Sequence, residues 1–145
     1  MAVTTKWFGQ AFLALANKEI DWVADTIKVS LHTSAFTPGQ DTMNYFDDLT
    51  DEVVGTGYTA DGEEIANKSQ AYDGATNIMK IDGDDVSWPG STITARYAVI
   101  TDVTPGTDAT NPLICWVDFG EDVSTSSGTL EIQWNADGIA RVTVS

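Results

Sequence analysis

The sequence predicts a mainly β protein, an antiparallel β-sandwich or jelly-roll-like barrel of seven to eight strands with one N-terminal amphipathic helix. Short stretches in which apolar and polar residues alternate recur through residues 25–145, and turn-forming residues separate them. Only residues 1–18 contain a long helical period. A length of 145 residues is typical of one domain. We therefore expect a single β-rich domain over 1–145, with a helix or docking segment at 1–18 and the β-sandwich at 25–145.

The stretch Ser91–Thr101 is predicted to be the central strand, because apolar side chains recur at every second position of one face. Its second half, Tyr97–Ile100, is apolar on both faces, which a strand tolerates only where both sides are covered. Pro112–Phe119 has the same character, and the polar residues 104–111 between them include a Pro-Gly pair. These features predict a long-looped antiparallel hairpin between two layers.

The clearest predicted helix runs from Lys6 to Asn17, capped by Thr4-Thr5, because apolar residues fall at i, i+4 and i+7. No acidic residue lies between Met1 and Lys18 in an otherwise acidic chain. This asymmetry suggests a docking segment. An alternative interpretation is that the aromatic residues simply cover one face of the sheet. The candidate partner-binding residues are Lys6, Trp7, Phe8 and Phe12.

The remaining elements are shorter. Asp25–Thr33 is predicted to be a strand with one wet face that includes His32, and Asp41 is predicted to cap a short helix. Further strands, of which the first two form a hairpin of edge strands, are predicted at Glu63–Tyr72, Asn77–Asp82, Leu130–Trp134 and Ile139–Val144. Turns are predicted at Asp73–Thr76, Pro89-Gly90 and Asn135–Gly138.

The charge balance argues against two classes of partner. With 22 acidic and 7 basic side chains the formal net charge is -15, which repels nucleic-acid phosphates and anionic lipid. The apolar runs are shorter than the roughly 20 residues that span a bilayer, and the N-terminus lacks the features of a signal peptide. We expect a soluble, unprocessed protein that binds neither nucleic acid nor membrane.

Candidate catalytic and metal sites are weak. His32 is the only histidine, has no identifiable nucleophile beside it, and is expected to be a satisfied surface residue. Cys115 is the only cysteine and is expected to be buried. The stretch Asp82–Asp85 lacks the later glutamate of an EF-hand loop. Carboxylate pairs suited to glycoside hydrolysis occur by chance in so acidic a chain. We expect no enzyme activity, cofactor or metal site.

Several motifs, in the same order, resemble the small structural proteins of tailed bacteriophages. They are Lys6–Phe12, Asp25–Ser34, Gly55–Thr59, Ala95–Ile100, Pro112–Gly120 and Gln133–Ile139. The resemblance runs over nearly the whole chain and is strongest to head decoration (cement) or minor capsid proteins. Cys115 stands where a small residue such as glycine is expected.

The resemblance implies a non-enzymatic virion protein on the capsid surface, assembled in the host cytoplasm. Such a protein binds the outside of the major capsid protein shell and stabilises it. It is expected to associate with copies of itself as a homo-oligomer, for which a trimer is one option. Two alternatives stay open: a tail or head-tail adaptor component, and a glycan-binding module for host attachment that uses some of the five tryptophans.

Overall fold

The two longest strands form the antiparallel hairpin that the sequence predicts. In the computed structural model, which describes residues 3–145, β7 spans Thr94–Asp102 and β8 spans Leu113–Ser124. Their register pairs Val99 with Trp116, and Ala98, Val99 and Ile100 are all buried. The prediction that this part of the hairpin is covered on both faces is confirmed.

Alternate side chains of the hairpin enter two hydrophobic clusters. Ala98, Ile100 and Val117 belong to the larger cluster, which also contains side chains of β6, β9 and the loops. Val99 and Trp116 belong to a smaller cluster with Phe8, Phe36 and other residues. Because successive side chains of a strand point to opposite faces, each face of the hairpin has its own core.

A five-stranded antiparallel sheet surrounds the hairpin, in the order β1-β8-β7-β2-β3. The added strands are β1 (Thr5–Trp7), β2 (Ile27–His32) and β3 (Glu63–Glu64). Beyond β2 the sheet continues briefly, because the Val53 N–H donates to the Leu31 carbonyl over 2.8 Å. One edge of the sheet is therefore β1, and the other is formed by β3 and residues near Val53.

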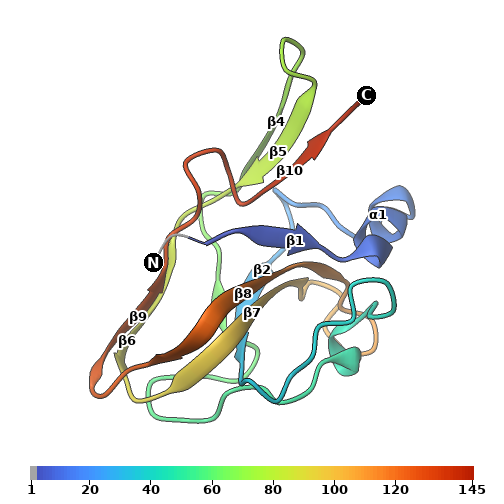
Figure 1. Cartoon of the computed structure of the whole chain (residues 1–145). Helices are drawn as coiled ribbons and strands as arrows, with labels where there is room; N and C mark the ends of the chain where they lie inside the picture. The colour runs from blue at the N-terminus through green and yellow to red at the C-terminus, as the bar shows by residue number, and fades with distance from the viewer. Residues whose placement is uncertain (1–2) are drawn as a thin grey trace.

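The other strands form two smaller sheets. The first has the order β10-β5-β4, and its strands are β4 (Ser69–Asp73), β5 (Ile78–Asp82) and β10 (Ala140–Thr143). We call it the projecting sheet, because it extends away from the rest of the molecule with the C-terminus at its end (Figure 1). The second pairs β6 (Val86–Ser91) with β9 (Gly128–Ile132).

Several expectations need correction. The described residues contain ten strands, more than the seven to eight predicted, and their three sheets do not close into a barrel. The predicted β4–β5 hairpin is present, but only β4 is an edge strand, because β5 also pairs with β10. Pro89-Gly90 lies within β6, at a shift in its register with β9, instead of forming a separate turn. The mainly β, antiparallel class with one α-helix is confirmed.

The N-terminal segment differs most from its prediction. The helix α1 spans only Gly9–Ala16, because residues 5–7 pair with β8 and are extended. Its buried residues are Ala11 and Ala14, so the helix approaches the core through small side chains. A short 3-10 helix, η1, spans Phe46–Asp48 and follows Tyr45; Asp41 does not cap it.

We predict that replacing Ile100 with Ala lowers the free energy of unfolding by about 2–5 kcal/mol, because this fully buried side chain joins β7 to the larger cluster. Urea denaturation followed by tryptophan fluorescence measures the change. Thr129→Ala, at an exposed position of β9, is the control and should change stability by less than about 0.5 kcal/mol. Equal, small effects at both positions would contradict the assignment of the core.

Candidate interaction surface

The acid-free N-terminal stretch, residues 3–18, lies along the β1 edge of the five-stranded sheet. Lys6 projects from β1 with its Nζ 4.9 Å from the centroid of the Trp116 ring, a cation–π contact. The Trp7 ring lies 5.0 Å, between centroids, from the ring of Phe12 on α1. The Trp7 Nε1 donates a hydrogen bond to the Arg141 carbonyl of β10 over 2.9 Å. One surface thus combines β1, α1 and the base of the projecting sheet.

The structure places three of the four candidate partner-binding residues at this surface. Lys6 is exposed, Trp7 is half-buried and Phe12 is 43% exposed. Phe8 is different: its side chain is fully buried in the smaller cluster, and its N–H donates to the Ile114 carbonyl over 3.0 Å. Phe8 is therefore a core residue and offers no side-chain surface to a partner.

The described part of the N-terminus is also bound to the rest of the chain. Residues 5–7 pair with β8, and the Val3 N–H donates to the Gln133 carbonyl over 3.2 Å. From Val3 onward the predicted docking segment is therefore part of the folded body of the protein; Met1 and Ala2 lie outside the described residues.

Sequence reasoning missed one residue of this surface. Leu13, next to Phe12, is 57% exposed and is one of the most exposed large apolar side chains described. The available signal was the spacing of Ala11 and Ala14, because small residues permit the closest approach of a helix to a sheet. If Ala11 and Ala14 face the core, Phe12 and Leu13 must face outward.

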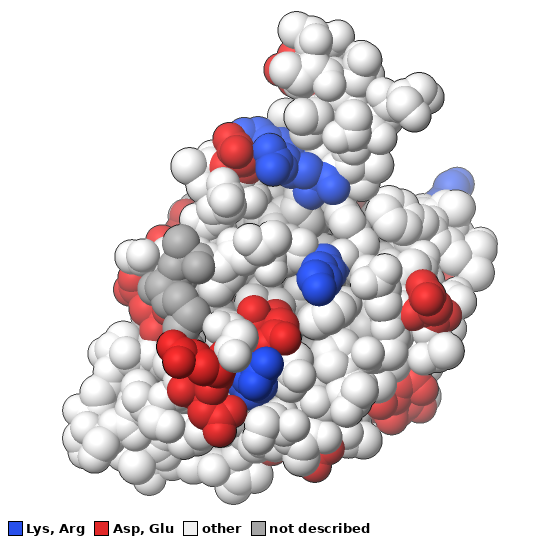
Figure 2. All heavy atoms as spheres, in the orientation of Figure 1, with Lys and Arg blue, Asp and Glu red and all other residues white. Residues whose placement is uncertain are grey.

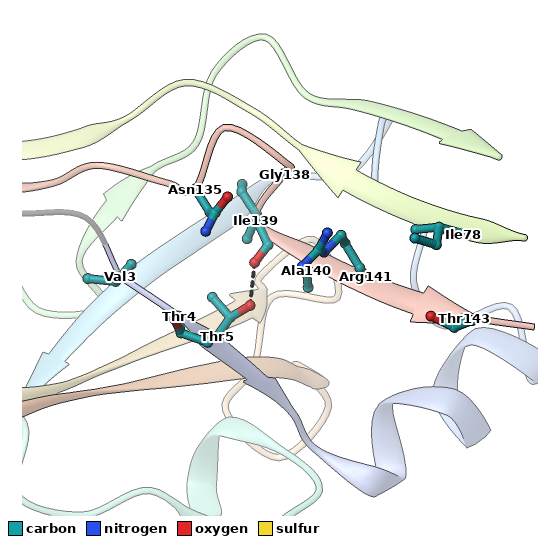
Figure 3. Close-up of a pocket in the computed structure, with 10 residues that line it drawn as sticks. All are labelled: Val3, Thr4, Thr5, Ile78, Asn135, Gly138, Ile139, Ala140, Arg141 and Thr143. Atoms are coloured by element: carbon teal, nitrogen blue, oxygen red, sulfur yellow. Dashed lines mark hydrogen bonds between the residues drawn. The ribbon is translucent and has the colours of Figure 1, made fainter. Parts of the chain in front are cut away.

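A groove of about 350 Å³ separates β1 from β10 (Figure 3). The Thr5 hydroxyl crosses it and donates to the Ile139 carbonyl, beside the Trp7 bond to Arg141. Because the Phe8 N–H bonds to β8, the N–H and C=O groups of Thr5 and Trp7 point away from β8 and toward β10. The side chains of Thr5 and Trp7 therefore hydrogen-bond β1 to β10, whereas neighbouring strands of one sheet are joined by backbone hydrogen bonds.

The projecting sheet has little cover. All five residues of β4 are exposed. A second groove of about 450 Å³ lies on one face, where Ala71, Ile78, Lys80 and Arg141 are among the lining residues. Figure 2 shows Lys and Arg side chains at the base of this sheet, with Asp or Glu side chains beside them, and Asp137 pairs with Arg141 there. Lys80 and Arg141 are direct neighbours across β5 and β10.

The single histidine and the single cysteine are both buried. His32 is fully buried, which corrects its assignment to a wet strand face; Ser30 beside it is buried as well. The His32 ring bonds through Nδ1 to the Thr50 carbonyl over 2.8 Å and through Nε2 to the Ser30 hydroxyl over 2.9 Å. Burial lowers the pKa of His32, and burial raises the pKa of the Cys115 thiol well above its usual value.

Asp102, at the end of β7, is a buried carboxyl group with an acidic neighbour. Its Oδ1 accepts the Thr104 N–H over 2.9 Å, while Oδ2 has no donor within hydrogen-bonding distance among the described residues. Burial, with hydrogen bonding to and repulsion from the Asp25 carboxylate, raises the pKa of Asp102 to about 7. A proton on the carboxyl group of Asp102 removes the charge that burial and the nearby Asp25 disfavour.

We predict that Asp102 makes stability fall as pH rises. The pKa of an unfolded Asp is ~3.9, whereas that of Asp102 in the folded chain is about 7. Between these two values the folded chain binds one proton more than the unfolded chain, so its stability falls as the pH rises. Asp102→Asn imitates the protonated acid. The free energy of unfolding of the variant minus that of wild type should increase by about 2 kcal/mol as the pH rises from 5 to 8. Urea denaturation at each pH measures this difference.

Asp108→Asn, in the exposed loop of the same hairpin, is the control and should follow the wild-type dependence on pH. If the Asp102→Asn and wild-type curves stay parallel, Asp102 does not carry the proton.

Two searches concern the described residues 3–145, one for a metal-binding cluster and one for a helix that could span a membrane. Residues 3–145 bring together no three His, Cys, Asp or Glu side chains that could hold a metal ion. Within the stretch Asp82–Asp85, Asp85 accepts the Trp134 N–H over 2.8 Å and Asp84 accepts the Asn67 amide N–H over 2.6 Å. Within the same residues, no helix is long and apolar enough to cross a bilayer.

Comparison with known proteins gives no match to a family model, to a curated protein or to a solved structure. The function is therefore argued from the surface described above and from the motif resemblance, which remains a prediction.

Proposed function

We propose that this chain is a non-enzymatic structural protein of a tailed bacteriophage virion. In this proposal it is a capsid decoration protein that binds the outer surface of the major capsid protein and stabilises the shell. The ordered motifs of the sequence support the phage context. The same proposal places the chain on the capsid surface, as a homo-oligomer.

The observation that carries an interaction role is the exposed apolar pair Phe12 and Leu13, which lies in the acid-free stretch that also contains Lys6. An acidic body docks poorly on another acidic surface, so contact with a shell is favoured where carboxylates are sparse. Trp7 adds to this surface, because its ring supports Phe12 from β1. Aromatic side chains of this kind dominate the energetics of many interfaces. We call Lys6, Trp7, Phe12 and Leu13 the anchor surface.

The same proposal includes a sandwich-like core. Trp88 on β6 and Leu130 and Ile132 on β9 share the larger hydrophobic cluster with Val29 and Ile100 of the five-stranded sheet. This common cluster supports treating the β6–β9 pair as a second layer over that sheet.

The tryptophans bear on the glycan-binding alternative. Trp22, Trp88, Trp116 and Trp134 are buried, and Trp7 is half-buried against Phe12. A sugar platform needs an exposed aromatic face, and none of these five rings is fully exposed. No feature of the described residues favours a role in the tail or in a head-tail adaptor. The position of the protein in the particle would distinguish these roles from capsid decoration.

We predict that Phe12→Ser with Leu13→Ser abolishes decoration. The experiment adds purified protein to isolated, undecorated capsids and measures occupancy by quantitative mass spectrometry. Phe12 is 43% and Leu13 57% exposed, and neither belongs to a core cluster, so the fold should persist, and circular dichroism checks this. Loss of two apolar contacts at the centre of an interface typically costs 2 kcal/mol or more, equivalent to about a 30-fold weaker affinity.

Val144→Ser is the matched control, because Val144 is 53% exposed but belongs to the projecting sheet, where its N–H donates to the Asn77 carbonyl over 2.8 Å. Its occupancy should equal that of wild type. A folded double variant that still decorates capsids at wild-type occupancy would show that the anchor surface is wrong. Wild-type protein that binds no capsid at all would refute the decoration role itself.

A further inference from the structure

We propose that the open edge of β4 pairs antiparallel with β4 of a second copy of this chain, about a twofold axis that passes beside Ala71. The inference names the contact behind the proposed homo-oligomer and rests on that part of the proposed function. It concerns a sheet edge that is separate from the anchor surface.

The outer edge of β4 is open along its whole length. β4 is the last strand of the projecting sheet, and among residues 3–145 no strand pairs with its other side. All of its residues, Ser69–Asp73, are exposed, and in Figure 1 the β4–β5 hairpin stands clear of the five-stranded sheet. Proteins commonly protect an edge strand with lysine, proline or a bulge. β4 itself contains no lysine or proline, and its register with β5 runs without a shift.

The register shows which backbone groups of β4 point outward. The Val144 N–H donates to the Asn77 carbonyl and continues the β5–β10 register. Odd-numbered residues of β5 therefore direct their N–H and C=O groups toward β10, and even-numbered residues direct theirs toward β4. Ala71 lies opposite an even-numbered residue and so bonds to β5. Its neighbours Gln70 and Tyr72 must then direct their N–H and C=O groups away from β5, at the open edge.

An identical strand in antiparallel orientation matches these outward groups. With Ala71 opposite Ala71 of the second copy, Gln70 lies opposite Tyr72, and the twofold axis repeats this pair. Each Gln70–Tyr72 pair exchanges both of its N–H···O bonds, because both residues point outward. Ala71 then occupies a non-hydrogen-bonded pair, in which the Cα atoms approach to roughly 4.5 Å and a small side chain fits. The two three-stranded sheets thus join into one.

The side chains and the local charge suit a second copy. In this register Ser69 lies opposite Asp73, whose carboxylate accepts a hydroxyl, and no like charges lie opposite each other. The charged residues between 65 and 81 are Lys68, Asp73 and Lys80, a formal charge of +1 in a chain of net charge -15. Copies of so acidic a chain repel each other at acidic surfaces, and β4 is an edge where they approach without that repulsion.

The experiment measures self-association of the free protein, without capsids, by sedimentation velocity at increasing concentration. Ala71→Lys places two ammonium groups opposite each other at the twofold axis, and Ala71→Glu places two carboxylates there. Each variant alone should associate at least about tenfold more weakly than wild type. An equimolar mixture of the two variants should recover dimers, because opposite charges then face each other across the axis.

The matched controls are Thr129→Lys and Thr129→Glu, which make the same changes in charge at an exposed position of β9. Both should associate like wild type, because β9 lies outside the projecting sheet. Circular dichroism confirms that each variant is folded.

A disulfide tests the register itself. Cα atoms about 4.4–6.8 Å apart permit the bond, and residues directly opposite each other in antiparallel strands lie within this range. Ala71→Cys should therefore give a cross-linked dimer on mild oxidation, measured by non-reducing electrophoresis, whereas Thr129→Cys should stay monomeric. Cys115 is buried and contributes no thiol to the reaction.

Wild-type protein that remains monomeric up to about 1 mM, a concentration at which even weak contacts form, would overturn the proposal. So would Ala71→Lys and Ala71→Glu variants that associate like wild type, or an equimolar mixture of them that stays monomeric. Because no capsid is present, this outcome is independent of decoration. A protein that pairs through β4 but binds no shell refutes the proposed function and leaves the contact between copies standing.

Discussion

The burial of both faces of the β7–β8 hairpin is the constraint on which the rest of the structure depends. Ala98 and Val99 point to opposite sides and both are buried, so each side needs a layer of its own. The β6–β9 pair and the larger cluster cover one side. Phe8, Phe36 and neighbouring loop residues cover the other. With the smaller cluster filled by these aromatics, α1 packs through Ala11 and presents Phe12 and Leu13 outward.

What could be predicted from the sequence followed from local pattern. The hairpin was predictable because its apolar residues occupy both faces, and the β4–β5 hairpin because a turn separates two alternating stretches. The N-terminal strand β1 was not predictable from local pattern, because it is stabilised by pairing with β8, more than 100 residues later in the chain. His32 was assigned to the surface because its partners, Ser30 and Thr50, satisfy it only after folding.

The candidate surface was predictable only in part, for the same physical reason. Composition alone located the acid-free stretch around Lys6, and Trp7 and Phe12 lie there. Periodicity could not decide which face of α1 is buried, because aromatic and alanine faces both have helical spacing. The structure buries Phe8 and Ala11 and leaves Leu13 exposed. The grooves depend on how two sheets diverge, which no local pattern encodes.

The anchor surface combines apolar side chains with Lys6 and lacks carboxylates, which suits docking of an acidic chain on a shell in the proposed role. Cryo-electron microscopy of intact virions tests the central claim, a capsid decoration role, most directly. A decoration protein should give density for this chain on the outside of the head, repeated over the shell; density confined to the tail, or none in the particle, would contradict the decoration role.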